Sequence, residues 1–219
     1  MPFGIPKNRQ AHAIVSYGKL LLKTTPQKPL TLTDVTQYYT LPYNNDSITI
    51  ATLPGVFSYG RLDKGSALLL NNLTGLPSGH LLDFGCGAGV IGSVLKKHYP
   101  SSHITLLDVD AFAVASSHLT LEANELTADV ICGDGITSAP AHLNAIITNP
   151  PFHQGIHTDY RATEQLLRDA SNHLKRQGEL RLVANNFLKY APLIENQIGP
   201  CSVLEQKQGF KVYQSILSR

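Results

Sequence analysis

The stretch HLLDFGCGAG, residues 80–89, decides the fold class of this chain. An apolar run that is suited to a buried strand leads directly into three closely spaced glycines, and a segment of helical length follows. From this point onward, short apolar runs alternate with helical segments, which is typical of βα units stacked around a parallel sheet. We expect the parallel strands at residues 81–84, 104–108, 129–132, 145–148 and 180–184.

Two later segments complete the predicted architecture. Residues 158–176 form the clearest expected helix, with one apolar stripe and with Gly178 as its C-terminal stop. Near the C-terminus, VLEQKQGFKVYQSIL contains two β-rich runs around Gly209. The segment between these runs is too short to connect two parallel strands. The runs therefore predict an antiparallel hairpin at one edge of the sheet. The expected fold class is therefore α/β, mostly parallel, with a C-terminal antiparallel hairpin.

Residues 1–60 differ from the rest of the chain. They contain prolines at positions 2, 6, 26, 29, 42 and 54, and the turn sequence NNDS at 44–47 predicts a β-hairpin that joins Tyr38 and Tyr39 to ITIAT. We expect residues 1–60 to be a small β-containing extension or linker, and residues 61–219 to be the main α/β domain.

Composition narrows the class of protein. The chain has 219 residues, 42% of them hydrophobic, and a formal net charge of +2, and this length suits one α/β domain with a full core. Its apolar runs end well before the roughly 20 residues that a membrane-spanning helix needs. Cys86, Cys132 and Cys201 lack the paired spacing of a zinc site or a disulfide framework. We expect a cytoplasmic protein without a metal and without a membrane partner.

The glycine loop predicts a nucleotide-like cofactor. Gly85, Gly87 and Gly89 lie between the tip of a strand and the start of a helix, where backbone N–H groups are free to meet a ligand. The G-x-G-x-G spacing differs from the G-x-G-x-x-G of dinucleotide sites, which disfavours NAD. Asp108 ends the second strand and is placed to accept both hydroxyls of a ribose, and Asp134 follows the third strand and is placed to accept from an adenine amino group.

The stretch NPPF, residues 149–152, suggests where a substrate binds. Two consecutive prolines cannot donate to a sheet, so they end the strand and fix the backbone beyond it. Asn149 offers a side-chain oxygen and Pro150 a backbone carbonyl to the hydrogens of an amino group, and Phe152 offers a face for a base to stack on. The structural alternative is a strand-ending turn. The adjacent His153 suits a pocket wall better than a general base.

In this order and spacing, the glycine loop, the two aspartates and NPPF resemble the S-adenosylmethionine-dependent methyltransferases with a seven-stranded Rossmann-like sheet. Four longer strings are similar to the bacterial ribosomal RNA guanine-N2 methyltransferases, in particular to those that act on 16S rRNA: LPGVFSYGRLDKGSALLL, NPPFHQG, GELRLVANNFLKY and FKVYQSILSR. This resemblance covers residues 7–219 and implies that residues 61–219 are an S-adenosylmethionine-dependent methyltransferase domain. It also implies S-adenosylmethionine as cofactor and ribosomal RNA, within the small subunit or its precursor, as partner.

The resemblance also implies roles for individual residues. It implies that Asn149, Pro150 and Phe152 bind the target guanine. It places Asp63, Gly65 and Ser66 at the border of the methionine end of the cofactor. It assigns the remaining cofactor contacts to Asp83, Gly85, Gly87, Gly89, Asp108 and Asp134.

Several alternatives remain open at this point. Family members are usually longer, with a degenerate first domain that is thought to help bind RNA, and we expect this chain to lack that domain. Enzymes that methylate 23S rRNA guanine, adenine N6 or glutamine N5 share much of the same motif set. A non-catalytic RNA-binding module is the remaining alternative, although such a module would have no chemical need for Asn149 or for a complete glycine loop.

Overall fold

The computed structural model describes residues 11–16, 19–24, 31–43, 46–150 and 161–218. The chain divides into two compact units, residues 1–35 and 36–219. The smaller unit contains an antiparallel hairpin of β1 (Ala11–Ser16) and β2 (Lys19–Thr24), followed by the short helix α1 (Leu32–Val35). The hydroxyl and backbone N–H of Thr31 both donate to the carboxylate of Asp34 at the start of that helix.

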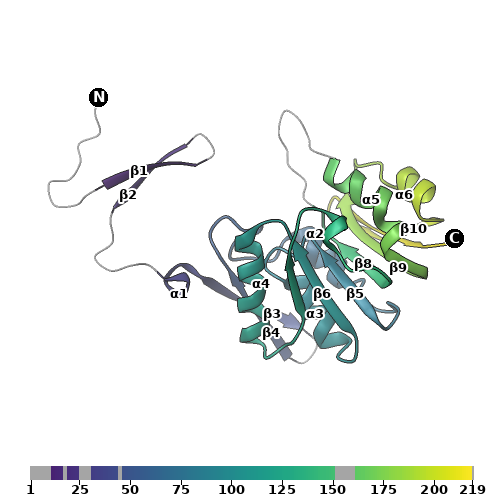
Figure 1. Ribbon diagram of the computed structural model, residues 1–219, viewed down its shortest axis with the longest axis horizontal. Coiled ribbons are helices and arrows are strands. Elements are labelled where there is room, and N and C mark those ends of the chain that lie inside the picture. The colour runs from purple at the N-terminus through teal and green to yellow at the C-terminus, as the bar shows by residue number, and fades with distance from the viewer. Residues whose placement is uncertain (1–10, 17–18, 25–30, 44–45, 151–160, 219) are drawn as a thin grey trace. The chain divides into compact units, whose positions relative to one another are not determined.

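The larger unit is built on a seven-stranded sheet with the order β10-β11-β9-β8-β5-β6-β7 (Figure 1). Its five parallel strands occur where the apolar runs predicted them, and the C-terminal pair is antiparallel to β9. The fold class predicted from the sequence is therefore confirmed. The strands are β5 (His80–Phe84), β6 (His103–Asp108), β7 (Asp129–Cys132), β8 (Leu143–Thr148), β9 (Leu174–Asn185), β10 (Cys201–Lys207) and β11 (Phe210–Ile216).

Helices cover both faces of this sheet. Successive residues of a strand point to opposite faces. Asp83 of β5 bonds to α3, whereas its neighbours Leu82 and Phe84 belong to the apolar cluster formed with α5 and α6. The helices of the larger unit are α2 (Lys64–Leu70), α3 (Val90–His98), α4 (Ala111–Ala123), α5 (Arg161–His173) and α6 (Ala191–Gln197), with a 3-10 turn at Ile136–Ser138. Within the ranges described, no helix has the length and apolarity needed to cross a membrane.

The predicted hairpin before the main sheet is present as β3 (Gln37–Tyr43) and β4 (Asp46–Thr52). Polar side chains of α4 satisfy the backbone along β4. Thr120 Oγ1 accepts from the Ala51 N–H at 3.0 Å, and Ser116 Oγ accepts from the Leu53 N–H at 3.1 Å. The hairpin is thus part of the larger compact unit, and the division at residue 60 into an extension and a catalytic domain stays a prediction.

The helix expected over residues 158–176 ends earlier than predicted. α5 stops at His173, and Leu174 already pairs with Leu143 of β8. The prediction of Gly178 as a helix stop is therefore wrong, because this residue lies in the irregular first part of β9. A Cβ atom at Gly178 would come within 2.8 Å of the Lys175 carbonyl oxygen, so glycine permits a close backbone approach there. The expected start of this helix, residues 158–160, lies outside the described residues.

A buried ion pair fastens α2 to the sheet. Arg181 and Glu179 of β9 are only 2% and 4% exposed, and Arg181 Nε donates to Glu179 Oε1 at 2.6 Å. The same guanidinium donates to the carbonyl oxygens of Asn72 and Thr74, in the turn that follows α2. A buried charge is tolerated only when it is paired and hydrogen-bonded. Glu179 supplies the opposite charge for Arg181, and the two backbone carbonyls accept its remaining hydrogen bonds.

We predict that Arg181→Ala destabilises the fold by about 3–5 kcal/mol, because Glu179 would be left as an unpaired buried charge. The matched control is Arg168→Ala, which removes an exposed ion pair with Glu164 within one helix and should cost at most about 0.5 kcal/mol. Urea unfolding of both variants measures the difference. Equal losses for the two would mean that the buried pair does not fasten α2.

Candidate functional site

The carboxyl ends of three adjacent parallel strands meet at one edge of the sheet. β5 lies between β8 and β6, and Phe84 at its end pairs with Thr148 on one side and Leu107 on the other. The residues that follow these three positions are Gly85, Asn149 and Asp108, respectively. Parallel register therefore brings the glycine loop, the Asn-Pro pair and the strand-end aspartate together, at the edge where ligands of open α/β folds bind.

The glycine loop has the backbone conformation that its sequence predicts. Gly85, Gly87 and Gly89 have φ values of 71°, 54° and 73°, in the left-handed region that favours glycine. A Cβ atom placed at Gly85 or Gly87 would find no heavy atom within 4 Å, whereas at Gly89 it would lie 3.0 Å from Ser117 Oγ. The first two glycines therefore face open space, and the third allows close packing of the loop on α4.

Hydrogen bonds hold the loop in place. The N–H groups of Gly85 and Cys86 donate to the Leu107 carbonyl at 2.8 and 3.0 Å, and the Gly87 N–H donates to Asp108 Oδ2 at 2.8 Å. The other carboxylate oxygen of Asp108 accepts from the Asp110 N–H at 3.0 Å. Each carboxylate oxygen has more than one acceptor direction, so Asp108 keeps acceptor capacity for ligand hydroxyls while it braces the loop.

Asp83 lies behind the loop and is fully buried. Its Oδ2 accepts from the Gly92 N–H of α3 at 2.7 Å, and its Oδ1 has no partner among the described residues. The pKa of Asp83 is raised to about 7, mainly by burial and to a smaller degree by the nearby charge of Asp108, although the hydrogen bond from the Gly92 N–H acts to lower it. The structure shows Asp83 holding α3 against β5, and a direct contact with the cofactor stays a prediction.

Asn149 is held by two residues that the sequence associated with the cofactor instead. Its side-chain nitrogen donates to Asp63 Oδ2 at 3.0 Å and to Ser66 Oγ at 2.9 Å. Asp63 also caps the N-terminus of α2, since its Oδ2 accepts from the Ser66 N–H at 2.9 Å. The capping role is visible in the sequence as Asp at N-cap. The link to Asn149, 86 residues away, is not, because nothing local in the sequence relates the two.

The remaining predicted residues are placed less completely. Asp134 is exposed just beyond β7, and the neighbouring Gly133 N–H donates to the Asp108 carbonyl, so both aspartates lie at the same edge. Pro150 is buried directly after Asn149. Phe152 and His153 lie outside the described residues.

A sequence model of the methyltransferase small domain family matches residues 47–214. The chain belongs to this family. The match covers β4 and almost all of the seven-stranded sheet, including every strand end that forms the candidate site.

Relatives of this methyltransferase domain agree with the resemblance inferred from its sequence. It is 55% identical over 214 residues to a Pseudomonas fluorescens protein and 54% identical over 213 residues to one from Pseudomonas aeruginosa. Both are named ribosomal RNA small subunit methyltransferase C. The alignments cover 98% and 97% of this chain, which spans 64% of the length of each relative.

Solved structures support the same fold. A T. thermophilus 16S rRNA N2 G1207 methyltransferase in complex with AdoMet and guanosine has a TM-score of 0.78 and 29% identity, and the match covers 96% of this chain and 58% of that one. A methyltransferase from Pyrococcus furiosus has a TM-score of 0.64 at 17% identity, covering 78% of this chain and 90% of that one, which indicates a shared fold.

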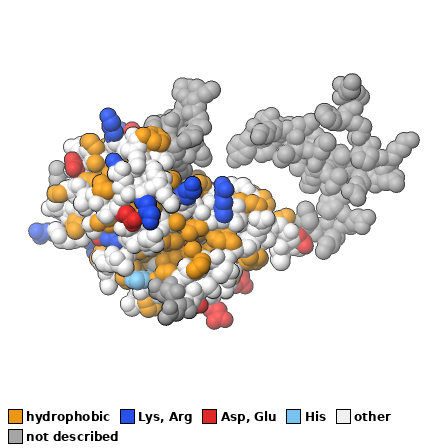
Figure 2. Space-filling view, turned by 180° about the vertical axis from the view of Figure 1, so that it is seen from behind, with side chains coloured by type: hydrophobic (Ala, Val, Ile, Leu, Met, Phe, Trp, Pro, Cys, Tyr) orange, Lys and Arg blue, Asp and Glu red, His pale blue; other side chains and the backbone are white. Residues whose placement is uncertain are grey.

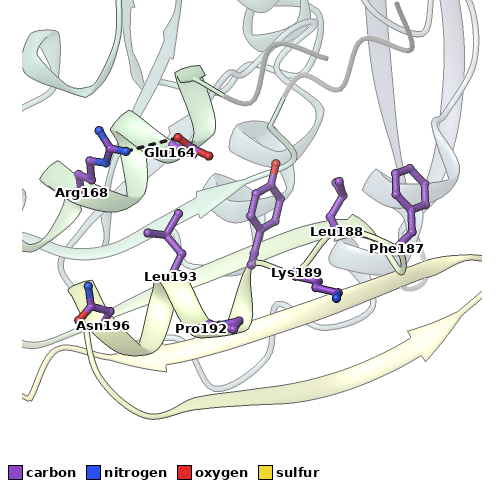
Figure 3. A pocket seen from close by; sticks show the side chains of 9 residues that line it. Glu164, Arg168, Phe187, Leu188, Lys189, Pro192, Leu193 and Asn196 are labelled. Atoms are coloured by element: carbon purple, nitrogen blue, oxygen red, sulfur yellow. Dashed lines mark hydrogen bonds and ion pairs between the residues drawn. The ribbon is translucent and has the colours of Figure 1, made fainter. Parts of the chain in front are cut away.

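Sequence reasoning missed a hollow on the α5 and α6 side of the methyltransferase domain (Figure 3). Of the predicted site residues that the structure describes, none is among the residues that line it. Figure 3 shows the Glu164–Arg168 ion pair on one side and Phe187 and Lys189 on another, where the chain leaves β9. Phe187 is 60% exposed, which is unusual for so large an apolar side chain. This exposure is visible only in the structure, so the sequence offered no signal for the hollow.

We predict that the stability that Asp83 contributes depends on pH. Its folded pKa of about 7 lies above the ordinary value of 3.8, so protonation favours the folded state. This contribution is fully present below about pH 4 and is lost as the pH rises towards 7. Asp83→Asn keeps an acceptor for the Gly92 N–H and removes the titration. The stability of the parent relative to this variant, measured by urea unfolding, should therefore fall between pH 4 and 7; a constant difference would contradict the assignment.

Proposed function

We propose that this domain transfers a methyl group from S-adenosylmethionine to the exocyclic N2 amino group of a guanine in 16S rRNA. The observation that carries the proposal is the position of Asn149 beside the glycine loop. Its side-chain nitrogen is engaged by Asp63 and Ser66, so its oxygen is the atom left to accept from a substrate. The names of the relatives favour small-subunit rRNA, and the T. thermophilus complex contains both AdoMet and guanosine.

The described residues fit the cofactor. The open space over Gly85 and Gly87 lets a ligand approach the loop backbone, and a side chain at either position would fill it. Asp108 would accept from the ribose hydroxyls, and Asp134 would accept from the adenine amino group. The bound cofactor supplies an electrophilic methyl group on a sulfonium sulfur.

Asn149 and Pro150 are placed to make the amino group that receives the methyl a better nucleophile. The lone pair of an exocyclic amino group is delocalised into the base, so the nitrogen is a poor nucleophile until it moves towards tetrahedral geometry. Two fixed acceptors for its hydrogens favour that change, and the Asn149 side-chain oxygen and the Pro150 carbonyl are the candidates. Stacking of the base on Phe152, and the role of His153, stay predictions.

A basic rim at the carboxyl edge of the sheet suits an RNA partner. Phe210 pairs with Asn185 at the end of β9, so the turn of the β10–β11 hairpin lies at the same edge as the glycine loop. Figure 2 shows Lys and Arg side chains among hydrophobic ones on one face of the molecule. We define the basic rim as Arg61 and Lys64, which flank the Asp63 that binds Asn149, together with Lys189, Lys207 and Lys211 near the ends of β9, β10 and β11. The exposed Phe187 lies near Lys189 in the hollow of Figure 3. Lys and Arg side chains bind the phosphates of RNA, and an exposed aromatic ring stacks on its unpaired bases.

We predict that replacing Lys189, Lys207 and Lys211 by Ala weakens RNA binding and lowers its dependence on salt, by about 0.7–1 in the log–log slope for each phosphate that is no longer neutralised. The control is Lys97→Ala with Lys175→Ala. These lysines lie at the C-terminal end of α3 and at the start of β9, the opposite edge of the sheet. Fluorescence anisotropy with 16S rRNA fragments at several salt concentrations measures the effect. Equal losses in both variants would argue against the basic rim.

The test of the proposed function is Asn149→Ala. An interaction made mainly in the transition state appears in the rate constant, so methyl transfer should slow by the equivalent of about 2–4 kcal/mol while cofactor affinity stays nearly unchanged. Single-turnover transfer of labelled methyl groups to 16S rRNA or small subunits from a strain lacking the enzyme measures the rate, and mass spectrometry of nucleosides identifies the product.

Separate reactions with 23S rRNA and with protein substrates distinguish the alternatives that share this motif set. N2-methylguanosine in 16S rRNA alone supports the proposal. Methylation of adenine N6 or of glutamine, or a variant that works as fast as the parent, would overturn it.

A further inference from the structure

We propose that Asp63 and Ser66 form a positioning pair that decides which end of the Asn149 amide meets the substrate, and that this pair restricts the site to an amino group that donates hydrogen bonds. The inference deepens the proposed function and rests on it. It differs from the expectation drawn from the sequence, in which Asp63 and Ser66 border the cofactor.

The chemistry of Asp63 fixes the orientation of the amide. An ionised carboxylate only accepts hydrogen bonds. The Asp63 Oδ2 atom lies 3.0 Å from the Asn149 side-chain nitrogen and 2.9 Å from the Ser66 backbone nitrogen. An amide turned by half a revolution would place its own oxygen against this carboxylate oxygen, and two acceptors at that distance repel each other. The nitrogen must therefore face Asp63.

Ser66 binds the second hydrogen of the amide once Asp63 has fixed its orientation, although a hydroxyl alone could pair with either end of the amide. Its hydroxyl oxygen lies 2.9 Å from the Asn149 nitrogen, so both amide hydrogens have acceptors within the protein. Among the residues that the structure describes, none donates to the Asn149 side-chain oxygen. The half-buried Asn149 thus presents an acceptor and withholds its donors.

This polarity selects the class of group that is methylated. An exocyclic amino group donates through both hydrogens and matches an acceptor. The guanine O6 and N7 atoms are acceptors themselves, and their approach would leave a buried polar group unpaired, which is a strong basis for rejection. An Asn149 that was free to turn would present a donor to O6 or N7 as readily as an acceptor to N2.

The surrounding residues hold the pair in place. Asp63 is the N-cap of α2, so its carboxylate is tied to the helix that carries Ser66. At Gly65, between them, a Cβ atom would lie 3.0 Å from Asp63 Oδ2 and 3.1 Å from a ring carbon of Phe210. Glycine at this position avoids a close contact that would displace the Asp63 carboxylate. The Arg181 guanidinium in turn ties the far end of α2 to the sheet.

The first experiment tests the orientation without any substrate. In ¹⁵N-labelled protein, the side-chain amide signal of Asn149 is identified by its loss in Asn149→Ala, and its hydrogen exchange is measured. We expect Asp63→Ala to speed this exchange roughly tenfold, the equivalent of a lost charge-assisted hydrogen bond, and Ser66→Ala to speed it less. Ser66→Ala keeps the backbone N–H that donates to Asp63, so the N-cap of α2 is retained.

The matched control is Asp110→Ala. Asp110 caps α4 through the same kind of bond, from the Phe112 N–H at 2.9 Å, and makes no contact with Asn149. It should destabilise the fold as much as Asp63→Ala through the lost cap, and leave the Asn149 signal unchanged. An Asn149 signal that does not respond to Asp63→Ala, or responds equally to Asp110→Ala, overturns the positioning pair whatever the domain methylates.

The second experiment separates the positioning role from a cofactor role. At saturating S-adenosylmethionine, Asp63→Ala should slow single-turnover methylation roughly as much as Asn149→Ala does, and the double variant should be no slower. Asp63→Asn keeps a capping acceptor and should restore part of the rate. Weaker cofactor binding with an unchanged saturated rate would instead assign Asp63 to the cofactor and overturn the proposal. A responsive NMR signal in a parent that methylates no guanine would refute the proposed function while the orientation of Asn149 stands.

Discussion

The parallel register of β8, β5 and β6 is the constraint on which the candidate site depends. These strands are buried in the middle of the sheet, and their carboxyl ends stop at neighbouring positions, with Phe84 between Thr148 and Leu107. A shift of one residue in either pairing would turn the buried side chains of a strand to the opposite face, which the helices on both faces forbid. The hydrophobic core therefore sets the distances between the glycine loop, Asp108 and Asn149 before any polar group acts on them.

Polar groups then refine what the core has placed. Asp108 and the Leu107 carbonyl hold the glycine loop from the side of β6, and Asp63 and Ser66 hold Asn149 from the side of α2. Each of these contacts joins a strand end to a segment distant in sequence. Preorganised acceptors matter for methyl transfer to an amino group, because they stabilise a change at nitrogen without having to move at the moment of reaction.

Two buried ionisable side chains fix the helices that carry the polar contacts of the site. Asp83 ties β5 to α3 behind the loop, and Arg181 ties β9 to the end of α2. Both are costly to bury: Arg181 is compensated by Glu179 and by backbone carbonyls, whereas Asp83 keeps one hydrogen bond and a raised pKa. Their place in the fold shows that a polar residue within a strand can support the site by fixing the helices around it.

The sequence by itself determined the class of fold, the glycine loop and the family. Apolar runs of strand length, glycines with positive φ and a proline pair are local signals, because they depend on neighbouring residues and on backbone geometry. The same reasoning is wrong at the end of α5: the apolar stripe continues through Leu174, but pairing with Leu143 of β8 competes with the helix there, and sheet pairing prevails. Only the tertiary structure decided that Asp63 and Ser66 hold Asn149, and that Asp83 lies behind the loop. These contacts join residues far apart in the chain, and their partners are chosen by how α2 and α3 pack on the sheet, which no local pattern encodes.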